Sequence, residues 1–283
     1  MGVLNVTPDS FADPEHVMTA GSAPDIGRAV AIAQAMESAG ADLIDIGGES
    51  TRPGAESVSE TEELERVVPV IEAIARHVRV PLSVDTYKPA VAAQAVAAGA
   101  SLVNDISGLS YEPALAGVVA ETGAGLILMH NRGRSSSMYA EAAYADLLGE
   151  IASELERALA IAAATGVDRN RIIVDPGIGF AKRPEHSYGV LAGFPELATR
   201  LGRPLLVGPS RKSFLQAVAL QAAAGDRPAA ARDWATAGAV AAAVLGGAHI
   251  IRVHAVAEMV QVMRVAEAIR RASATGSAES PAR

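Results

Sequence analysis

The segment Ile172-Ile173-Val174-Asp175 is a short apolar run that ends in a carboxylate, and the same pattern recurs along the chain. Seven further runs share it: residues 3–5, 43–45, 82–85, 102–105, 126–130, 205–208 and 250–254. A continuous apolar run is typical of a parallel strand that is covered on both faces. Eight such strands that alternate with helices predict an α/β fold, a single-domain (β/α)8 TIM barrel, whose functional groups lie where the strands end.

Helical periodicity fills the gaps between these runs. Ser59 and Glu62 form a capping box, and Gly40 and Gly99 act as C-terminal stop signals. Helices are expected at residues 26–39, 59–74, 89–98, 113–122, 142–165, 185–201 and 256–271, with two more in 212–246 that are separated at 225–228. The catalytic domain should therefore span residues 1–271, and the Ser/Ala/Gly-rich tail 272–283 is expected to be disordered.

Bulk composition excludes several classes of protein. Half of the 283 residues are hydrophobic, yet no apolar run approaches the length of roughly 20 residues that spans a bilayer. The net charge of −8 argues against non-specific binding to nucleic acid. There is no cysteine, so disulfides and thiolate chemistry are excluded and a metal must use oxygen or nitrogen ligands. No signal peptide is visible, and a cytoplasmic enzyme is expected.

Polar residues close four of the predicted strands: Asp45, Asp85, Asn104 and Asp175. Capping of the following helix explains any one of them as well as binding does. All four, however, should point to the same opening of a barrel, which favours binding. Carboxylates accept hydrogen bonds, so such a wall would suit a flat heterocycle with NH and NH₂ donors.

Basic residues gather at the last two strands. Ser210-Arg211-Lys212-Ser213 follows the seventh, while Arg252 and His254 end the eighth, where barrels of this class frequently bind phosphate. A solvated Arg–Lys pair is the alternative. A Schiff-base role for Lys212 would need an apolar pocket, and its neighbours are polar. Asn5 could ligate Mg²⁺ or simply form a turn.

Long polar loops follow the first, second and fifth strands, at residues 7–24, 47–54 and 131–139, and are predicted to be binding loops. Gly177-Ile178-Gly179-Phe180 lacks the third glycine of a dinucleotide fingerprint, so its glycines are predicted to let the backbone turn close to a ligand, with Phe180 free to pack on a ring. His130 alone is interpreted as a packed residue rather than a catalyst.

Seven motifs, in order along the chain, closely resemble those of the dihydropteroate synthases: residues 1–11, 45–54, 84–88, 104–106, 175–180, 210–213 and 252–254. The resemblance covers essentially the whole chain. It implies an enzyme of folate biosynthesis that joins 6-hydroxymethyl-7,8-dihydropterin diphosphate to 4-aminobenzoate and releases pyrophosphate and 7,8-dihydropteroate. Departure of the leaving group, stabilised by cations and Mg²⁺, would give a pterin cation that the amine attacks.

The resemblance also assigns roles to residues. Those implied to be catalytic are Asp9, Arg52 and Lys212. Those implied to hold the pterin are Asp45, Asp85, Asn104, Met129, Asp175 and Lys212. The diphosphate would contact Asn5, Thr51, Arg52, Arg252 and His254, with Mg²⁺ on Asn5. The 4-aminobenzoate pocket would contain Phe11, Pro53, Phe180, Lys212 and Ser213. The apolar faces of the last helices would suit a homodimer.

The chain departs from the family pattern at Ala255, at Gln216 and in the first loop, residues 11–15. These departures raise the hypothesis of a form that discriminates against sulfonamides, which mimic 4-aminobenzoate. Two alternatives stay open: a pterin-binding methyltransferase domain, and a catalytically silent paralogue. The basic motif at residues 210–213 and the loop at 50–54 argue against the first. Against the second stands the retention of Asn5, Asp9, Arg52, Lys212, Arg252 and His254.

Overall fold

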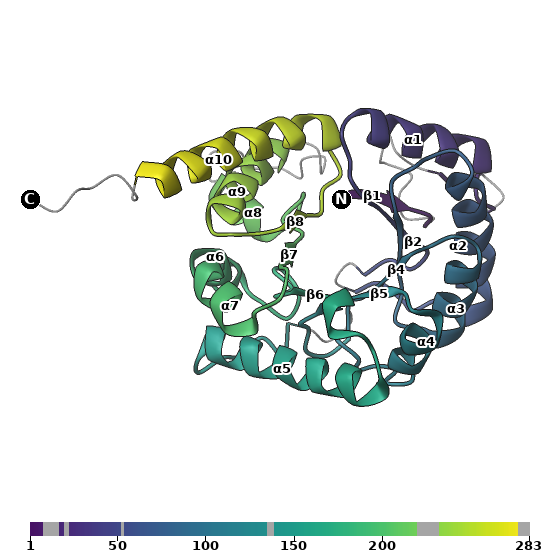
Figure 1. Cartoon of the computed structure of the whole chain (residues 1–283), viewed down its shortest axis with the longest axis horizontal. Coiled ribbons are helices and arrows are strands. Elements are labelled where there is room, and N and C mark those ends of the chain that lie inside the picture. The colour runs from purple at the N-terminus through teal and green to yellow at the C-terminus, as the bar shows by residue number, and fades with distance from the viewer. Residues whose placement is uncertain (8–16, 20–22, 52–53, 135–138, 220–231, 277–283) are drawn as a thin grey trace, which may run out of the picture.

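A computed structural model describes residues 1–7, 17–19, 23–51, 54–134, 139–219 and 232–276. Six parallel strands form one sheet in sequence order: β1 (Gly2–Asn5), β2 (Ile44–Gly47), β3 (Leu82–Asp85), β4 (Leu102–Asp105), β5 (Gly125–Met129) and β6 (Ile172–Asp175). Strands β7 (Leu206–Val207) and β8 (Ile250–Ile251) form a second parallel pair. Parallel bridges from Val174 to Leu205 and from Gly2 to Val253 join the two sheets into a closed ring. The predicted eight-stranded barrel is confirmed (Figure 1).

Helices surround the strands. They are α1 (Ile26–Ser38), α2 (Glu60–Ala75), α3 (Pro89–Ala97), α4 (Leu115–Thr122), α5 (Leu147–Thr165), α6 (Pro184–Ala192), α7 (Phe194–Leu201), α8 (Phe214–Ala219), α9 (Asp233–Leu245) and α10 (Val256–Gly276), with a 3₁₀ turn at Arg169–Arg171. The predicted cap of α2 is present, because Ser59 Oγ accepts from the backbone N–H of Glu62 at 3.2 Å. No helix in the described ranges combines the length and the apolar character that crossing a bilayer requires.

Three predicted helix boundaries are wrong. Helix α5 begins at Leu147 rather than at residue 142, because Asp146 caps it through a 3.1 Å bond from Gly149 N–H. The helix predicted over residues 185–201 is two helices, since Gly193 ends α6 and Pro195 lies in the first turn of α7. Helix α10 continues to Gly276, past the predicted end at Arg271. Disorder of residues 277–283 stays a prediction outside the described residues.

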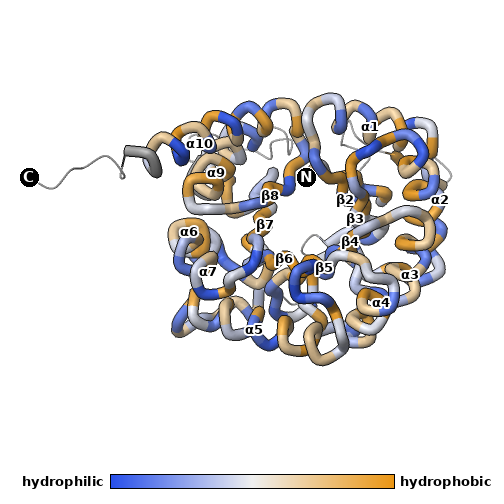
Figure 2. Tube along the Cα trace, in the orientation of Figure 1, coloured by the Kyte–Doolittle hydropathy of each residue, from blue (hydrophilic) through white to orange (hydrophobic). Residues whose placement is uncertain are grey.

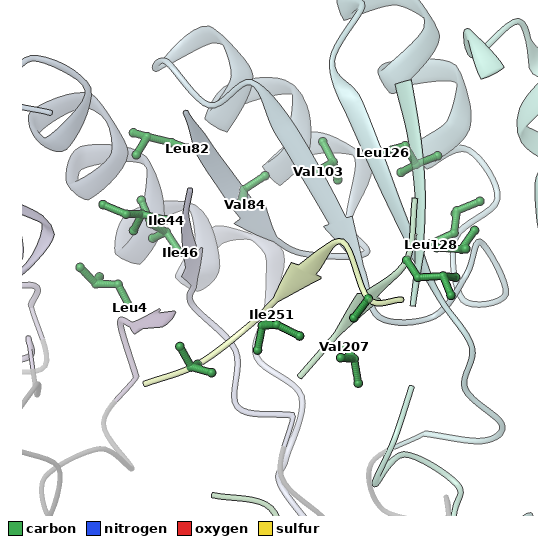
Figure 3. Packing of buried hydrophobic residues seen from close by; sticks show 14 of the residues in the cluster. Leu4, Ile44, Ile46, Leu82, Val84, Val103, Leu126, Leu128, Val207 and Ile251 are labelled. Carbon is green, nitrogen blue, oxygen red and sulfur yellow. The ribbon is translucent and has the colours of Figure 1, made fainter. Parts of the chain in front are cut away.

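The main hydrophobic core lies between the strands and the helices. Figure 3 shows strand residues of this layer, among them Leu4, Ile44, Val84, Val103, Leu128 and Ile251. A smaller cluster, made of Met1, Leu43, Ile127 and Leu206, is separate from that layer. Figure 2 shows hydrophobic residues along the strands that ring the centre. Burial on both strand faces explains why the strands read as continuous apolar runs.

Candidate active site

The strand register brings the predicted polar wall together. Paired residues of neighbouring parallel strands point to the same face of a sheet, and side chains alternate along each strand. Asp85 pairs with Gly47 on one side and with Asn104 on the other. Met129 pairs with Asp175. Asp45 lies two residues before Gly47 and therefore shares its face. These residues approach the barrel axis at the carboxyl ends of the strands, as predicted.

Arg252 joins two of the acids. Its Nε donates to Asp45 Oδ2 at 2.7 Å, and its Nη2 donates to Asp85 Oδ2 at 2.8 Å. Asn104 Nδ2 also donates to Asp45 Oδ2, at 3.0 Å. Asp45 is fully buried, and its other oxygen has no partner in the described part of the chain. Asp45 therefore holds Asn104 and Arg252 in place from beneath.

One guanidinium serves two carboxylates, so the cluster would carry a net negative charge if both were ionised. Burial raises the pKa of Asp85 to about 8; Arg252 opposes the shift, and Asp45 adds to it. Burial would lower the pKa of Arg252, but the two carboxylates outweigh that effect and the pKa lies above its ordinary value. Arg252 thus stays charged while Asp85 holds its proton more readily than an exposed aspartate.

Lys212 lies opposite Asp175. Its ammonium donates to the carbonyl of Ile178 and sits 4.3 Å from the centroid of the Phe180 ring. Burial lowers the pKa of Lys212 to about 8, with Asp175 opposing the shift and Arg252 adding to it. The neighbours are polar, as predicted, although burial alone is enough to depress the pKa. Burial likewise raises the pKa of Asp175, against the influence of Lys212 and of the Gly177 N–H.

Two glycines shape the turn after β6. Gly177 has φ +66° and Gly179 has φ +79°, a region that residues with a Cβ rarely adopt. A Cβ on Gly177 would lie 2.0 Å from the carbonyl oxygen of His130, and one on Gly179 would lie 2.8 Å from Cδ of Lys212. The glycines thus permit the predicted tight turn. The groups that approach its backbone closely are the His130 carbonyl and the Lys212 side chain.

The side chains of the basic motif after β7, residues 210–213, point in different directions. Ser210 is buried, and its hydroxyl lies 2.9 Å from Nδ1 of His254. Arg211 turns to α9, where its Nε and Nη2 donate to the carboxylate of Asp233 at 2.9 and 3.1 Å. Asp233 thus engages the guanidinium of Arg211 on the side of α9. Ser213 is exposed at the start of α8.

The remaining predicted residues fall into two groups. Asn5 ends β1 beside Gly47, and Thr51 is half-buried in the loop after β2. The other group lies outside the described residues: Asp9, Phe11, Arg52 and Pro53.

The start of the loop after β2 is firmly anchored. Lys88 Nζ donates to Glu49 at 2.6 Å and to the carbonyl of Val58 at 2.8 Å, and it also bonds Glu63. Tyr87 donates its hydroxyl to Glu49 at 3.0 Å. These bonds hold both flanks of the segment that carries Thr51.

A cavity of about 470 Å³ opens beside the wall. It is lined by the loop at residues 54–57 and by Glu49, Tyr87, Ile106, Tyr111 and Arg134. The Tyr87 and Tyr111 rings meet edge to face at 5.2 Å, and the Arg134 guanidinium lies 4.4 Å from the Tyr111 ring centroid. Ile106 and Tyr87 share a buried cluster with Met129, so the aromatic lining continues into the wall.

Sequence reasoning missed Lys182, which is only 1% exposed. A lysine in a polar loop is normally solvated, so composition gave no reason to examine it. The only signal was its place two residues after Phe180, in a turn with two glycines. His130, interpreted as a packed residue, is buried and bonds Glu154 through Nε2 at 3.0 Å.

Residues 1–254 match the family described as "Pterin binding enzyme". The chain is 46% identical to a dihydropteroate synthase of Synechocystis, covering 96% of this chain and 90% of that one. It is 43% identical to the dihydropteroate synthase of Escherichia coli, covering 95% and 90%.

Solved structures agree in fold as well. The dihydropteroate synthase of Yersinia pestis in a sulfonamide drug complex superposes with a TM-score of 0.87 at 44% identity, covering 96% of this chain and 94% of that one. The Xanthomonas albilineans dihydropteroate synthase with 4-aminobenzoic acid gives a TM-score of 0.84 at 38% identity, covering 95% and 92%.

Proposed function

The chain belongs to the dihydropteroate synthase family, whose members are transferases of folate biosynthesis, and we propose that the residues gathered at its barrel mouth carry that reaction. The observation that supports this most is the meeting of Asp85, Asp175, Lys212 and Arg252 at one rim. The C–O bond of the pterin 6-hydroxymethyl diphosphate breaks, the amine of 4-aminobenzoate forms a C–N bond to the same carbon, and the amine releases a proton.

The wall of acids and amide binds the pterin. Asp175 and Asn104 face the opening and offer oxygen acceptors that suit the NH and NH₂ groups of the ring. Met129 supplies an apolar surface for its face. Asp45 is enclosed, so we assign it the task of holding Asn104 and Arg252 rather than a contact with the ring. Burial makes these bonds strong because water does not compete for them.

Arg252, His254 and Asn5 hold the departing diphosphate. Arg252 commits Nε and Nη2 to carboxylates, while Nη1 has no partner among the described residues and can bind an anion. Positive charge at this place stabilises the negative charge that grows on the leaving group. Thr51 lies in the anchored loop nearby. Arg52 and Asp9 lie outside the described residues, so their proposed catalytic roles rest on the resemblance alone.

Magnesium fits this arrangement as an ion that binds together with the substrate. Mg²⁺ usually takes one or two protein oxygens plus substrate phosphates. Within the described ranges no group of three or more His, Asp or Glu residues could hold a metal. The amide oxygen of Asn5 would be its protein ligand. The ion would supply charge that neutralises the leaving diphosphate.

Phe180, Lys212 and Ser213 form the side that receives 4-aminobenzoate. Phe180 offers a ring for packing, and Lys212, 4.3 Å from that ring, offers positive charge beside it. Phe11 and Pro53 would complete this pocket, but they lie outside the described residues. The relative from Xanthomonas albilineans binds 4-aminobenzoic acid, which supports the same ligand here.

A pyrophosphate-release assay tests the proposal. Release should require both the pterin diphosphate and 4-aminobenzoate. Asp175→Asn should lower kcat/KM about 100-fold, since a charged hydrogen bond contributes about 1.5–3 kcal/mol. Asp168→Asn is the matched control, because Asp168 precedes the opposite end of the same strand and should leave the rate unchanged. Methyl transfer without pyrophosphate release, or no reaction at all, would refute the synthase assignment in favour of a methyltransferase or a silent paralogue.

A homodimer is proposed from the last helices. Leu245 on α9 and Val265 and Ile269 on α10 are 46%, 62% and 51% exposed. Exposed aliphatic residues grouped in this way are typical of contacts between subunits. Light scattering should give twice the chain mass, and Val265→Glu should halve it. Ile161→Glu, on α5, is the control that should leave the mass unchanged; a monomeric wild type would contradict the proposal.

Discrimination against sulfonamides is a separate proposal. Gln216, one of the departures from the family pattern, accepts a bond from Arg232 Nη1 at 3.4 Å on the side that carries Lys212. Inhibition constants for sulfonamides should then exceed the KM for 4-aminobenzoate by at least tenfold. Similar values would end the proposal.

A further inference from the structure

The turn at residues 177–182 is held by the side chains of Tyr144, Ser187 and Lys212 and by that of its own Lys182. The carbonyl of Ile178 accepts from Lys212. The carbonyl of Phe180 accepts from Lys182 Nζ at 3.1 Å, and that of Ala181 accepts from the Tyr144 hydroxyl at 2.9 Å. In addition, Gly179 N–H donates to Ser187 Oγ at 3.1 Å. Three carbonyls and one N–H of the turn are therefore held by side chains.

The turn needs this support. Ala181 has φ +46°, in the left-handed region, which costs a residue with a Cβ roughly 1–2 kcal/mol. Gly177 and Gly179 also have positive φ. A backbone in which every second residue is left-handed forms no repetitive hydrogen bonds of its own, so the surrounding side chains must impose its shape.

Lys182 is the largest fully buried side chain among these supports. Besides the Phe180 carbonyl, its Nζ meets Nδ1 of His130 at 2.8 Å. His130 Nε2 faces Glu154, whose carboxylate is also bound by Arg132, with Nε at 3.2 Å from both oxygens. Burial lowers the pKa of His130 to about 4, so the ring is neutral at pH 7. It carries its proton on the side of Glu154, and its Nδ1 lone pair accepts from Lys182.

This chain of bonds connects two strand ends of the wall. His130 directly follows Met129 at the end of β5, and its backbone N–H donates to the Asp175 carbonyl at 2.8 Å. Lys182 therefore ties the turn after β6 to the end of β5. The same turn carries Phe180, and its Ile178 carbonyl accepts a hydrogen bond from the ammonium of Lys212. No other bond in the described part of the chain connects the Phe180 carbonyl to a neighbouring strand end.

We propose that Lys182 is a positioning residue for the reaction: by bridging the Phe180 carbonyl and the His130 ring, it fixes the places of Phe180 and Lys212 toward 4-aminobenzoate. The side chain is only 1% exposed, so it acts through Phe180 and Lys212 rather than by contact with substrate. This inference rests on the proposed placement of 4-aminobenzoate beside Phe180 and Lys212. It adds a residue to which sequence reasoning gave no role.

Steady-state kinetics of Lys182→Met test the proposal. The methionine fills a similar volume but cannot bridge the two acceptors. The KM for 4-aminobenzoate should rise about tenfold, while kcat changes less than threefold. If the substitution only reduced the fraction of folded enzyme, the apparent kcat would fall and the KM would stay unchanged, which is the opposite pattern. Arg203→Met is the control, since Arg203 donates to the carbonyl of Arg169 at 2.7 Å at the far end of the barrel.

Tyr144→Phe decides the matter should Lys182→Met fail to fold. It removes only the hydroxyl that holds the Ala181 carbonyl, and it should raise the same KM about threefold. An unchanged KM in the variants that fold, with an active wild type, would overturn the role of the Lys182 bridge and leave the proposed function standing. A wild type that releases no pyrophosphate from the two substrates would overturn the proposed function, and the inference with it.

Discussion

The ammonium of Lys212 should make the stability of this protein depend on pH in a characteristic way. Burial lowers its pKa from 10.5 in the unfolded chain to about 8 in the folded protein. Between these two values the unfolded chain binds a proton that the folded protein has released. The free energy of unfolding therefore rises with pH across this window, and below pH 8 Lys212 adds no pH dependence.

The size of the effect follows from the same two numbers. A shift from 10.5 to about 8 corresponds to about 3 kcal/mol, at about 1.4 kcal/mol per pH unit. In Lys212→Met this increment is absent. The free energy of unfolding of the wild type, minus that of Lys212→Met, should thus increase by about 3 kcal/mol from pH 7.5 to pH 10.5. Groups far from Lys212 that titrate in both proteins cancel in this difference, whereas Asp175 and Asp85, which interact with its charge, contribute to it.

Urea unfolding followed by far-ultraviolet circular dichroism at half-unit steps of pH measures that difference. Lys88→Met is the control. Burial would lower the pKa of Lys88, but its bonds to Glu49 and Glu63 outweigh this effect and the pKa is raised. The stabilisation from Lys88 is therefore complete below pH 10.5, and its difference curve should be flat from pH 7.5 to 10. A flat curve for Lys212→Met as well would refute the view that Lys212 is desolvated by the site.

Three further outcomes are expected. Arg252→Met leaves two buried carboxylates without their cation and should lower the free energy of unfolding by about 3–5 kcal/mol at pH 7 in urea titrations; a loss below 1 kcal/mol would contradict the shared ion pair. Gly177→Ala should lower the melting temperature far more than Gly202→Ala, because both glycines have positive φ but only Gly177 would bring a Cβ against backbone; equal shifts would mean that the backbone yields. Chelation of Mg²⁺ should suppress pyrophosphate release, and Asn5→Ala should raise the Mg²⁺ concentration needed for half-maximal rate; release that persists in chelator would remove Asn5 from its proposed role.

The barrel could be predicted because its strands are buried on both faces. A strand of that kind must be apolar along its whole length, so a polar residue at its end stands out against the run. Asp85, Asn104 and Asp175 were found in this way, and the register places them on one inner face. The helix break at Gly193 was missed because helical periodicity continues on both sides of it.

Partners between distant residues could not be predicted. Arg211 and Lys212 are neighbours in sequence, yet one bonds Asp233 and the other the Ile178 carbonyl. Arg211 has φ +58°, and nothing in its residue type indicates that backbone shape. Burial of Lys182 likewise depends on His130 and the Phe180 carbonyl, which only the folded chain brings together.

The Arg252 guanidinium, which bonds Asp45 on β2 and Asp85 on β3, also limits which substitutions this sequence can accept. Replacing Arg252 alone leaves the fully buried Asp45 without its cation, and replacing Asp45 alone leaves Arg252 with Asp85 as its remaining carboxylate partner. A sequence that replaced Arg252, Asp45 and Asp85 by apolar residues one at a time would pass through a poorly folding intermediate, even though the final protein could be more stable. Arg252 and Asp45 should therefore change together or not at all, whatever happens to the ligands bound above them.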